Sequence, residues 1–310
     1  MSRNSEPGPA PGRGEPPAGG PAVSVLGLGP MGLPIARVLV AKGARVTGWN
    51  RSAGPAEALR AAGGVPVARP SELDGGVVLA VLPDVPQLRL VLGLDSDSAD
   101  LAWLRGRQLV VMSTTSPRRM RELAAELEPH GVHVLDSPMS GGDAGAAAGT
   151  LSLMVGGSPE QYAAVRPVLE MIGTTVRHLG PVGSGSVAKL CNQIVVASAV
   201  TSLGEALVIA ERAGLSIAAM LELLSGGFGD SAVLRAKYAR LLAEDYDGGG
   251  SARNQLKDLR YAVELAAELG VPVAPIEPLV DLFERIVAEG RGHLDHTVVR
   301  RQLRGGALRG

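Results

Sequence analysis

Cysteine, aromatic residues and lysine are scarce in this sequence. Cys191 is the only cysteine among 310 residues, which excludes an internal disulfide and an all-cysteine metal site and favours a reducing, cytoplasmic location. Aromatic residues make up only 3% of the chain, so its cores must be built from Val, Leu, Ile and Ala. Lysine occurs only at Lys42, Lys189, Lys237 and Lys257, and we expect a role for Lys189 and Lys257, which lie inside motifs.

The sequence also lacks an excess of charge of one sign and a long uninterrupted apolar run. Its formal net charge is −1, which gives no electrostatic signature for nucleic acid or for an anionic membrane surface. No apolar run reaches the roughly 18 residues needed to cross a bilayer. We therefore expect neither a nucleic-acid partner nor a membrane partner. Residues 1–20 are rich in Pro and Gly, lack an apolar segment and are predicted to form a disordered tail.

The first half of the chain alternates between apolar runs of strand length and helical patterns. Its length and its 45% content of apolar residues are enough for two domains with real cores. The predicted strands cover residues 22–26, 45–49, 76–82, 108–112, 132–135, 151–155 and 176–179. This alternation predicts an α/β domain of the Rossmann type with a parallel sheet, at residues 21–182.

The turn after the first predicted strand has the glycine pattern of a dinucleotide site. The pattern consists of Gly27, Leu28, Gly29, Pro30, Met31 and Gly32, between a strand and a helix. The glycines allow a tight turn, a close approach of the backbone to a pyrophosphate, and close packing of the helix on the strand. We therefore predict a dinucleotide cofactor, held by these six residues.

The end of the second predicted strand favours NADP(H) over NAD(H). An NAD site usually presents an acidic residue there, whereas an arginine accommodates a 2′-phosphate. This chain has Asn50, Arg51 and Ser52 and no acid. Arg51 is the expected phosphate clamp, with Asn50 and Ser52 as hydrogen-bonding neighbours. The alternative is that Arg51 is a solvated surface residue, and NAD(H) stays possible.

Further cofactor contacts are expected at the carboxyl ends of later strands, where open parallel sheets bind their ligands. These ends lie at Leu82 and Pro83, at Thr114 and at Asp136. Thr114 is well placed to face the cofactor, whereas Ser116 could simply cap the helix predicted at 117–128.

A glycine-rich stretch follows Asp136 and is predicted to be a loop. Within it, Ser140 precedes Gly141 and Gly142, and consecutive glycines let successive backbone N–H groups converge on an anion. We expect these three residues to hold a substrate carboxylate, and a flexible connector is the alternative.

The longest helical pattern begins after Gly183. Residues 186–212 contain no proline and are apolar around nearly the whole circumference, so we expect a helix that is buried on all sides. Lys189 lies in its first turns, with Asn192 and Gln193 on the same face. An isolated buried ammonium is costly unless it is paired or used. We therefore expect Lys189 to be functional, in preference to a lysine that snorkels to solvent.

The remaining sequence predicts an all-α domain at residues 183–310. Later helical patterns cover residues 217–224, 231–244, 253–269 and 275–289. Because the long central helix is apolar all round and longer than such a domain needs, we predict that it is shared with a second subunit, in a homodimer or a dimer of dimers. Burial within one chain is the alternative.

Five motifs, taken together, resemble the β-hydroxyacid dehydrogenase superfamily, and especially tartronate semialdehyde reductases and 3-hydroxyisobutyrate dehydrogenases. The motifs are residues 27–32, residues 113–117, residues 136–142, Gly183-Ser184-Gly185 followed by Lys189, and Lys257-Asp258-Leu259. The resemblance covers about residues 22–300, and five motifs in the same order are specific.

The resemblance implies a role for each matching residue. Lys189 corresponds to the family's invariant lysine, the general acid and base, and Ser140, Gly141 and Gly142 correspond to the element that holds the substrate carboxylate. Asn192 or Gln193 corresponds to an amide that supports the substrate, and Lys257 to a lysine that reaches the cofactor or the substrate. One departure is the glycine run at 248–250, where the family usually has an aromatic residue.

These observations predict an NADP(H)-preferring oxidoreductase that interconverts a small β-hydroxyacid and its aldehyde or keto acid, without a metal. Hydride delivered to a carbonyl carbon creates an alkoxide, which Lys189 would protonate, and burial would lower the pKa of Lys189 into a useful range. Two alternatives stay open. Imine reductases resemble this architecture but generally lack the lysine, and a nucleotide-binding interaction module would need no turnover.

Overall fold

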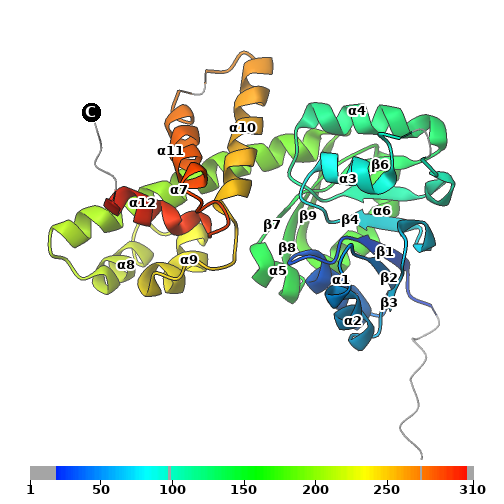
Figure 1. Ribbon diagram of the computed structural model, residues 1–310, viewed down its shortest axis with the longest axis horizontal. Coiled ribbons are helices and arrows are strands. Elements are labelled where there is room, and N and C mark those ends of the chain that lie inside the picture. Colours follow the sequence, from blue (N-terminus) through cyan, green and yellow to red (C-terminus); the bar gives the residue numbers. More distant parts are fainter. Residues whose placement is uncertain (1–18, 97–98, 273, 306–310) are drawn as a thin grey trace, which may run out of the picture.

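The computed structural model describes residues 19–96, 99–272 and 274–305. Residues 1–18 of the predicted tail and residues 306–310 lie outside this part of the chain. A sheet domain with helices on both faces stands beside a domain built from helices, and one long helix runs from the first into the second (Figure 1).

The sheet has nine strands among the described residues, and its order is β3-β2-β1-β4-β5-β6-β8-β7, with β9 paired to β8. The strands are β1 (Ala22–Leu26), β2 (Arg45–Trp49), β3 (Val65–Pro66), β4 (Val77–Ala80), β5 (Gln108–Val111), β6 (His133–Asp136), β7 (Met139–Ser140), β8 (Leu151–Gly156) and β9 (Gly173–Gly180). The first six are parallel, which confirms the Rossmann-type sheet. The sheet is not parallel throughout, since β8 is antiparallel to both β6 and β7.

Two layers of helices cover the sheet because its central strands are apolar on both faces, as β4 illustrates with four buried residues. One core contains α1 (Gly32–Ala41), α2 (Gly54–Ala61), α5 (Gly142–Ala148) and α6 (Pro159–Ile172). The other contains α3 (Val85–Leu92) and α4 (Pro117–Leu127). Ser116 precedes α4, but its side chain makes no capping hydrogen bond.

The glycine-rich stretch after Asp136 is not a simple loop. It forms the short strand β7 and then the helix α5, which ends at Gly149 with φ of 66°. Four of the seven residues of α5 are alanines, which favour the helix strongly enough to offset its two glycines. This local propensity is the reason that the predicted loop is largely ordered.

The second domain is helical, as predicted. It contains α7 (Ser184–Arg212), α8 (Ile217–Ser225), α9 (Ala232–Ala243), α10 (Ala252–Glu268), α11 (Glu277–Ala288), the 3-10 turn η4 (His296–Val298) and α12 (Val299–Gly305). Ser216, Ser231 and Ser251 each cap the helix that follows, by accepting a hydrogen bond from a backbone N–H. The sequence patterns did not indicate η4 or α12.

The long helix α7 is not buried on all sides within one chain, so that prediction is wrong for the single subunit. Val195 and Ile209 are 67% and 69% exposed, and they belong to one stripe with Cys191, Ser198, Ser202 and Glu205. By length and composition α7 is also apolar enough to span a membrane, although no uninterrupted apolar run in the sequence was expected to reach that length. In the structure it packs against β8, α10 and α12, which is the position of a core helix.

Candidate active site

The first turn of α7 is fixed to the sheet by Asp136, at the end of β6. The carboxylate of Asp136 is fully buried and accepts hydrogen bonds from the backbone N–H groups of Gly183 at 2.7 Å and Ser186 at 2.6 Å. A side chain at Gly185 would place its Cβ 2.1 Å from the carbonyl oxygen of Met154. Asp136 therefore caps a helix, although its position at a strand end suggested a ligand contact. This cap sets the position of Lys189.

Lys189 is buried and unpaired. Its side chain is only 7% exposed, and the ammonium makes no hydrogen bond or ion pair with any described residue. Burial lowers the pKa of Lys189 to about 8, against the opposing effect of the Asp258 carboxylate, while the charge of Lys257 lowers it further. The amine is therefore able to give or take a proton near neutral pH.

The two candidate amides are linked to each other. Asn192 donates its side-chain N–H to Gln193 Oε1 at 3.1 Å, and Gln193 donates its own to Asp258 Oδ2 at 2.6 Å. Asp258 is buried, which raises its pKa, while Lys257 and Lys189 act in the opposite direction. The structure thus links Gln193 to α10 directly, through Asp258, and it links Asn192 to α10 only through Gln193.

Asp258 is a site residue that the sequence reasoning did not select, although it lies inside the Lys257-Asp258 motif. The Lys257 ammonium lies 3.1 Å from Asp258 Oδ1 and also donates to the carbonyl oxygens of Pro83, at 3.4 Å, and Thr114. Leu82 lies at the same strand ends, since its carbonyl oxygen accepts a hydrogen bond from the Ser113 hydroxyl at 2.7 Å. Lys257 therefore connects α10 to the carboxyl ends of β4 and β5.

One turn further along α10, Tyr261 makes a second connection between the domains, which no sequence pattern indicated. Its hydroxyl donates to Asp84 Oδ2 at 2.5 Å, while Asp84 Oδ1 accepts from the backbone of Val85 and caps α3. Both side chains are buried. The Arg119 guanidinium and the Lys257 ammonium lie 5.3 and 5.5 Å from the centre of the Tyr261 ring, within the range of cation–π attraction.

The glycine loop after β1 has the steric properties of a pyrophosphate cradle. A Cβ at Gly27 would lie 2.4 Å from the carbonyl oxygen of Val81, and one at Gly32 would lie 1.8 Å from the carbonyl oxygen of Gly27. A Cβ at Gly29 would meet no atom within 4 Å, so the space beside it is open. Met31, at the start of α1, provides no side-chain cap, which leaves the helix N–H groups to a ligand. The loop, including Leu28 and Pro30, therefore fits a dinucleotide.

The residues after β2 form an ordered turn with an exposed arginine. Asn50 Oδ1 accepts a hydrogen bond from the backbone of Leu28 at 3.0 Å, and Asn50 Nδ2 donates to Ser52 Oγ at 2.8 Å. Asn50 thereby ties the turn to the glycine loop. Arg51 is exposed and makes no hydrogen bond or ion pair with any described residue. Its guanidinium is available for a phosphate.

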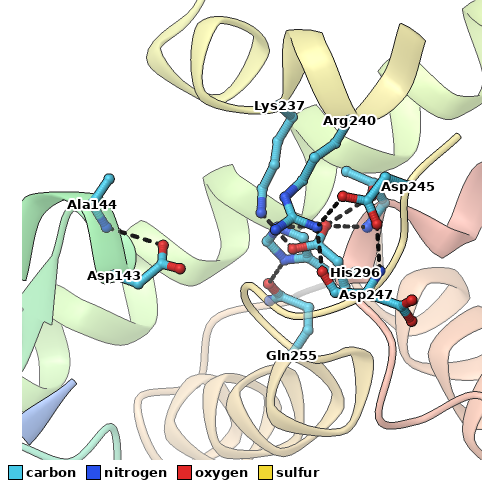
Figure 2. Close-up of polar contacts among 10 residues, drawn as sticks. Asp143, Ala144, Lys237, Arg240, Asp245, Asp247, Gln255 and His296 are labelled. Atoms are coloured by element: carbon cyan, nitrogen blue, oxygen red, sulfur yellow. Dashed lines mark hydrogen bonds and ion pairs between the residues drawn. The ribbon is translucent and has the colours of Figure 1, made fainter. Parts of the chain in front are cut away.

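Ser140, Gly141 and Gly142 lie at the junction of β7 and α5. Gly141 and Gly142 have φ values of 130° and 63°, a region that side-chain-bearing residues rarely adopt. No hydrogen bond joins these three residues to Lys189 within the described chain. Figure 2 shows the next residues, Asp143 and Ala144, across from a polar cluster of the helical domain.

We call this cluster the His296 cluster, and it consists of Lys237, Gln255, Asp295 and His296. Figure 2 labels three of them, Lys237, Gln255 and His296. Lys237 Nζ lies 2.5 Å from Asp295 Oδ2, and Gln255 Oε1 lies 3.1 Å from His296 Nδ1. The sequence reasoning missed all four residues as a group, because α9, α10 and η4 bring them together only in the fold.

The His296 cluster explains the glycine run at 248–250. Gly248 and Gly249 have φ values of 73° and 71°, and a Cβ at Gly249 would lie 2.2 Å from Asp295 Oδ2. The carbonyl oxygen of Gly250 accepts a hydrogen bond from the backbone of His296 at 2.7 Å. The run is therefore packed against η4 and bonded to it.

Comparison with known proteins identifies the family. Residues 22–180 match the model for the NAD binding domain of 6-phosphogluconate dehydrogenase, and residues 183–303 match the model described as NAD-binding of NADP-dependent 3-hydroxyisobutyrate dehydrogenase. The chain is 32% identical over 277 residues to 2-hydroxy-3-oxopropionate reductase of Escherichia coli K12, a match that covers 88% of this chain and 94% of the relative.

Solved structures agree with this family assignment. The 3-hydroxyisobutyrate dehydrogenase of Mycobacterium tuberculosis, solved with L-serine, is 30% identical and superposes with a TM-score of 0.79, over 92% of this chain and all of that one. An imine reductase from a Pseudomonas species shares the fold at a TM-score of 0.64 and 23% identity, over 92% of this chain and all of that one. The chain therefore belongs to the β-hydroxyacid dehydrogenase superfamily of NAD(P)-dependent oxidoreductases.

Proposed function

We propose that the protein is an NADP(H)-preferring oxidoreductase that interconverts a small β-hydroxyacid and the corresponding semialdehyde or keto acid. The observation that carries this proposal is Lys189, a buried lysine without a hydrogen-bond or ion-pair partner among the described residues, whose pKa is lowered to about 8. Structural lysines in a protein interior are usually paired. An unpaired amine at the start of the helix between the two domains is suited to proton transfer.

Each polar group around Lys189 has a task in this reaction. The nicotinamide supplies or accepts the hydride. Lys189 gives its proton to the developing alkoxide during reduction and removes the hydroxyl proton during oxidation. Asp258 balances the charge of Lys189 and Lys257 while it holds the Gln193 amide. The N–H groups of the turn at Ser140, Gly141 and Gly142 bind the substrate carboxylate.

The turn after β2 supports the proposed preference for NADP(H). Asn50 and Ser52 hold this turn next to the glycine loop, and Arg51 extends from it with no partner in the described chain. No acidic residue lies there to bind the hydroxyl of an NAD ribose. Arg51 therefore clamps a 2′-phosphate. At the other end of the cofactor, Leu82, Pro83, Thr114 and Lys257 surround the nicotinamide.

Two relatives support the proposed substrate class. One is named for 2-hydroxy-3-oxopropionate, and the Mycobacterium tuberculosis relative is named for 3-hydroxyisobutyrate and was solved with L-serine, so all three compounds are small carboxylic acids with an oxygen at C3. We infer a small carboxylic acid for this chain as well. We also infer a homodimer or a dimer of dimers, in which a second subunit covers the exposed stripe of α7, and a cytoplasmic location.

A panel of semialdehydes, keto acids and cyclic imines, assayed by oxidation of NADPH and NADH, tests the proposal. We expect turnover of a small semialdehyde or keto acid and no turnover of imines. Lys189→Ala should lower kcat by about 10²- to 10⁴-fold, as for the loss of a general acid, while NADPH binding persists. Lys42→Ala, at an exposed lysine beyond α1, is the matched control. Near-normal turnover by Lys189→Ala would refute the role of Lys189.

Asn192 and Gln193 need separate variants. Gln193 contacts Asp258 directly, whereas Asn192 reaches it only through Gln193. If Asn192 contacts the substrate, Asn192→Ala should raise KM and lower kcat, and Gln193→Ala should mainly change the pH dependence of kcat, through Asp258. The opposite pattern would assign the substrate contact to Gln193.

A further inference from the structure

The exposed stripe of α7 is one residue wide and follows most of the helix. It consists of Cys191, Val195, Ser198, Ser202, Glu205 and Ile209, and Arg212 continues it in the last turn. Between Ser184 and Ala210, no other residue of α7 is exposed in the described chain. The chain itself therefore covers the other sides of α7, at least in part, and leaves this stripe to water.

The spacing of the stripe is that of a seam between two packed helices. From Cys191 to Arg212, successive members are alternately four and three residues apart, which gives a repeat of seven. Such a repeat keeps one side of a helix against a second helix that crosses it at about 20°. The 29 residues of α7 span roughly 43 Å, whereas α10, the next longest described helix, has 17 residues. The partner of matching length is therefore α7 of a second copy of this chain.

An antiparallel arrangement of two copies matches the stripe with itself. When a two-fold axis passes beside Ser202, residues about equally far before and after Ser202 face each other. Val195 then meets the partner subunit's Ile209, so two apolar side chains that are 67% and 69% exposed cover each other. Ser198 meets the partner subunit's Glu205. Its hydroxyl can donate to that carboxylate, which makes no hydrogen bond or ion pair with any described residue of its own chain.

A parallel arrangement brings like charges together. Each residue then lies opposite its own copy, so Glu205 faces the partner's Glu205 and Arg212 faces the partner's Arg212. Like charges placed opposite each other across an interface cost affinity. In the antiparallel arrangement Arg212 faces the partner's Cys191, and both repulsions disappear.

We propose that two copies of this chain dimerise through the exposed stripe of α7, with the two helices antiparallel and the two-fold axis beside Ser202. This inference rests on the second subunit of the proposed function, and it adds the surface, the direction and the register of the contact. Lys189 lies 13 residues before Ser202. The two active sites therefore lie at opposite ends of the helix pair, about 39 Å apart along its axis.

Thiol cross-linking tests the direction of the helices, because Cys191 is the only cysteine of the chain. The variant with Cys191→Ser and Ser202→Cys has its thiols at the axis, where a short bismaleimide should join them. It should give about tenfold more covalent dimer than the matched control with Cys191→Ser and Leu90→Cys, since packed helices lie close together. Leu90, on α3, is 73% exposed and reports random collisions. Wild type should not exceed this control, because its two Cys191 thiols lie about 33 Å apart along the axis.

A pair of charges tests the register of the helices. Val195→Glu and Ile209→Lys should each raise the dissociation constant of the dimer about tenfold or more, measured by sedimentation equilibrium, because each places a charge against an apolar side chain. The double variant sets each new glutamate opposite a new lysine of the other copy and should recover most of that loss. In a parallel pair it would set like charges against each other and bind more weakly than either single variant.

Three outcomes would overturn this pairing: a covalent dimer formed through Cys191 in wild type, a double variant that binds no better than the single ones, and a monomeric wild type. Turnover tells its failure apart from that of the proposed reaction. If wild type reduces a semialdehyde or keto acid but Ser202→Cys gives no more covalent dimer than Leu90→Cys, only the pairing is refuted. If the cross-links form as expected and nothing in the panel is reduced, the reaction is refuted and the pairing stands.

Discussion

Replacing Lys189 by methionine should stabilise the fold at pH 7 while it abolishes turnover. Methionine fills a similar volume without a charge, and Lys189 has no partner in the described chain that the change would leave unpaired. Burial lowers the pKa of Lys189 from 10.5 to about 8. Since a tenfold change in an ionisation equilibrium corresponds to about 1.4 kcal/mol, the charged form destabilises the native state by about 3 kcal/mol.

The pH dependence has a definite sign. The pKa of Lys189 is lower in the folded chain than in the unfolded chain, so between about pH 8 and 10.5 the unfolded chain binds a proton that the folded chain has lost. The free energy of unfolding of wild type should therefore rise through this window, relative to Lys189→Met. The advantage of the methionine variant should be largest below about pH 8 and nearly absent at pH 10.5.

Urea unfolding of both proteins at pH 7 and pH 10, followed by circular dichroism, measures this difference. Lys237→Met is the matched control, because Lys237 is paired with the fully buried Asp295. Its loss leaves a buried carboxylate without a partner and should destabilise the fold by about 3–5 kcal/mol. If Lys189→Met were destabilising at pH 7, or if its effect were the same at pH 10, the idea of an unpaired buried ammonium would be wrong.

Three further variants test the contacts around the site. Arg51→Ala should lower kcat/KM for NADPH about tenfold or more with little effect on NADH, because a charge-assisted bond to the 2′-phosphate is lost; an unchanged ratio of the two efficiencies would contradict the clamp. Tyr261→Phe removes the hydroxyl that joins α10 to Asp84 and should speed NADPH release, measured by stopped-flow fluorescence. An unaltered release rate would show that this contact does not hold the domains together. Asp136→Asn leaves one N–H of the first turn of α7 unpaired and should lower the free energy of unfolding by about 1–3 kcal/mol, and an unchanged urea midpoint would argue against the cap.

Local patterns in the sequence were enough to predict most of the fold. The strands β1, β2, β4, β5, β6, β8 and β9 and the long helices all lie close to their predicted ranges, because apolar periodicity and serine caps act over a few residues. The antiparallel direction of β8 could not be predicted in this way. It depends on how β7 and β8 pair after the turn at Gly141 and Gly142, and pairing direction leaves no trace in the periodicity of a single strand.

The candidate site was predictable where its residues lie together in the sequence. Lys189, Asn192 and Gln193 share one helix face, and the glycine loop occupies consecutive positions. The partners of these residues were not predictable. Asp258 lies 65 residues from the Gln193 amide that it binds, and Asp84 lies 177 residues from Tyr261. Such pairs follow only from the packing of α10 against α7 and the strand ends.

These long-range contacts form a continuous polar chain from the helical domain to the sheet. It runs from His296 through Gln255 to the Gln193 carbonyl oxygen, and from the Gln193 side chain through Asp258 and Lys257 to the carbonyl oxygens of Thr114 and Pro83. A neutral link contributes about 0.5–1.5 kcal/mol to stability and a link to a charged group about 1.5–3 kcal/mol. Because burying the charges costs several kcal/mol, a well-packed apolar interface could hold the domains equally well.

Lys189 lies within reach of the charges of Asp258 and Lys257 but makes no hydrogen bond or ion pair with any described residue. Packing alone gives no reason to bury an ammonium group that lacks such a contact. An alkoxide that develops on a bound substrate would supply the missing partner, so the group that is costly in the free protein is the one that function requires at the reacting oxygen.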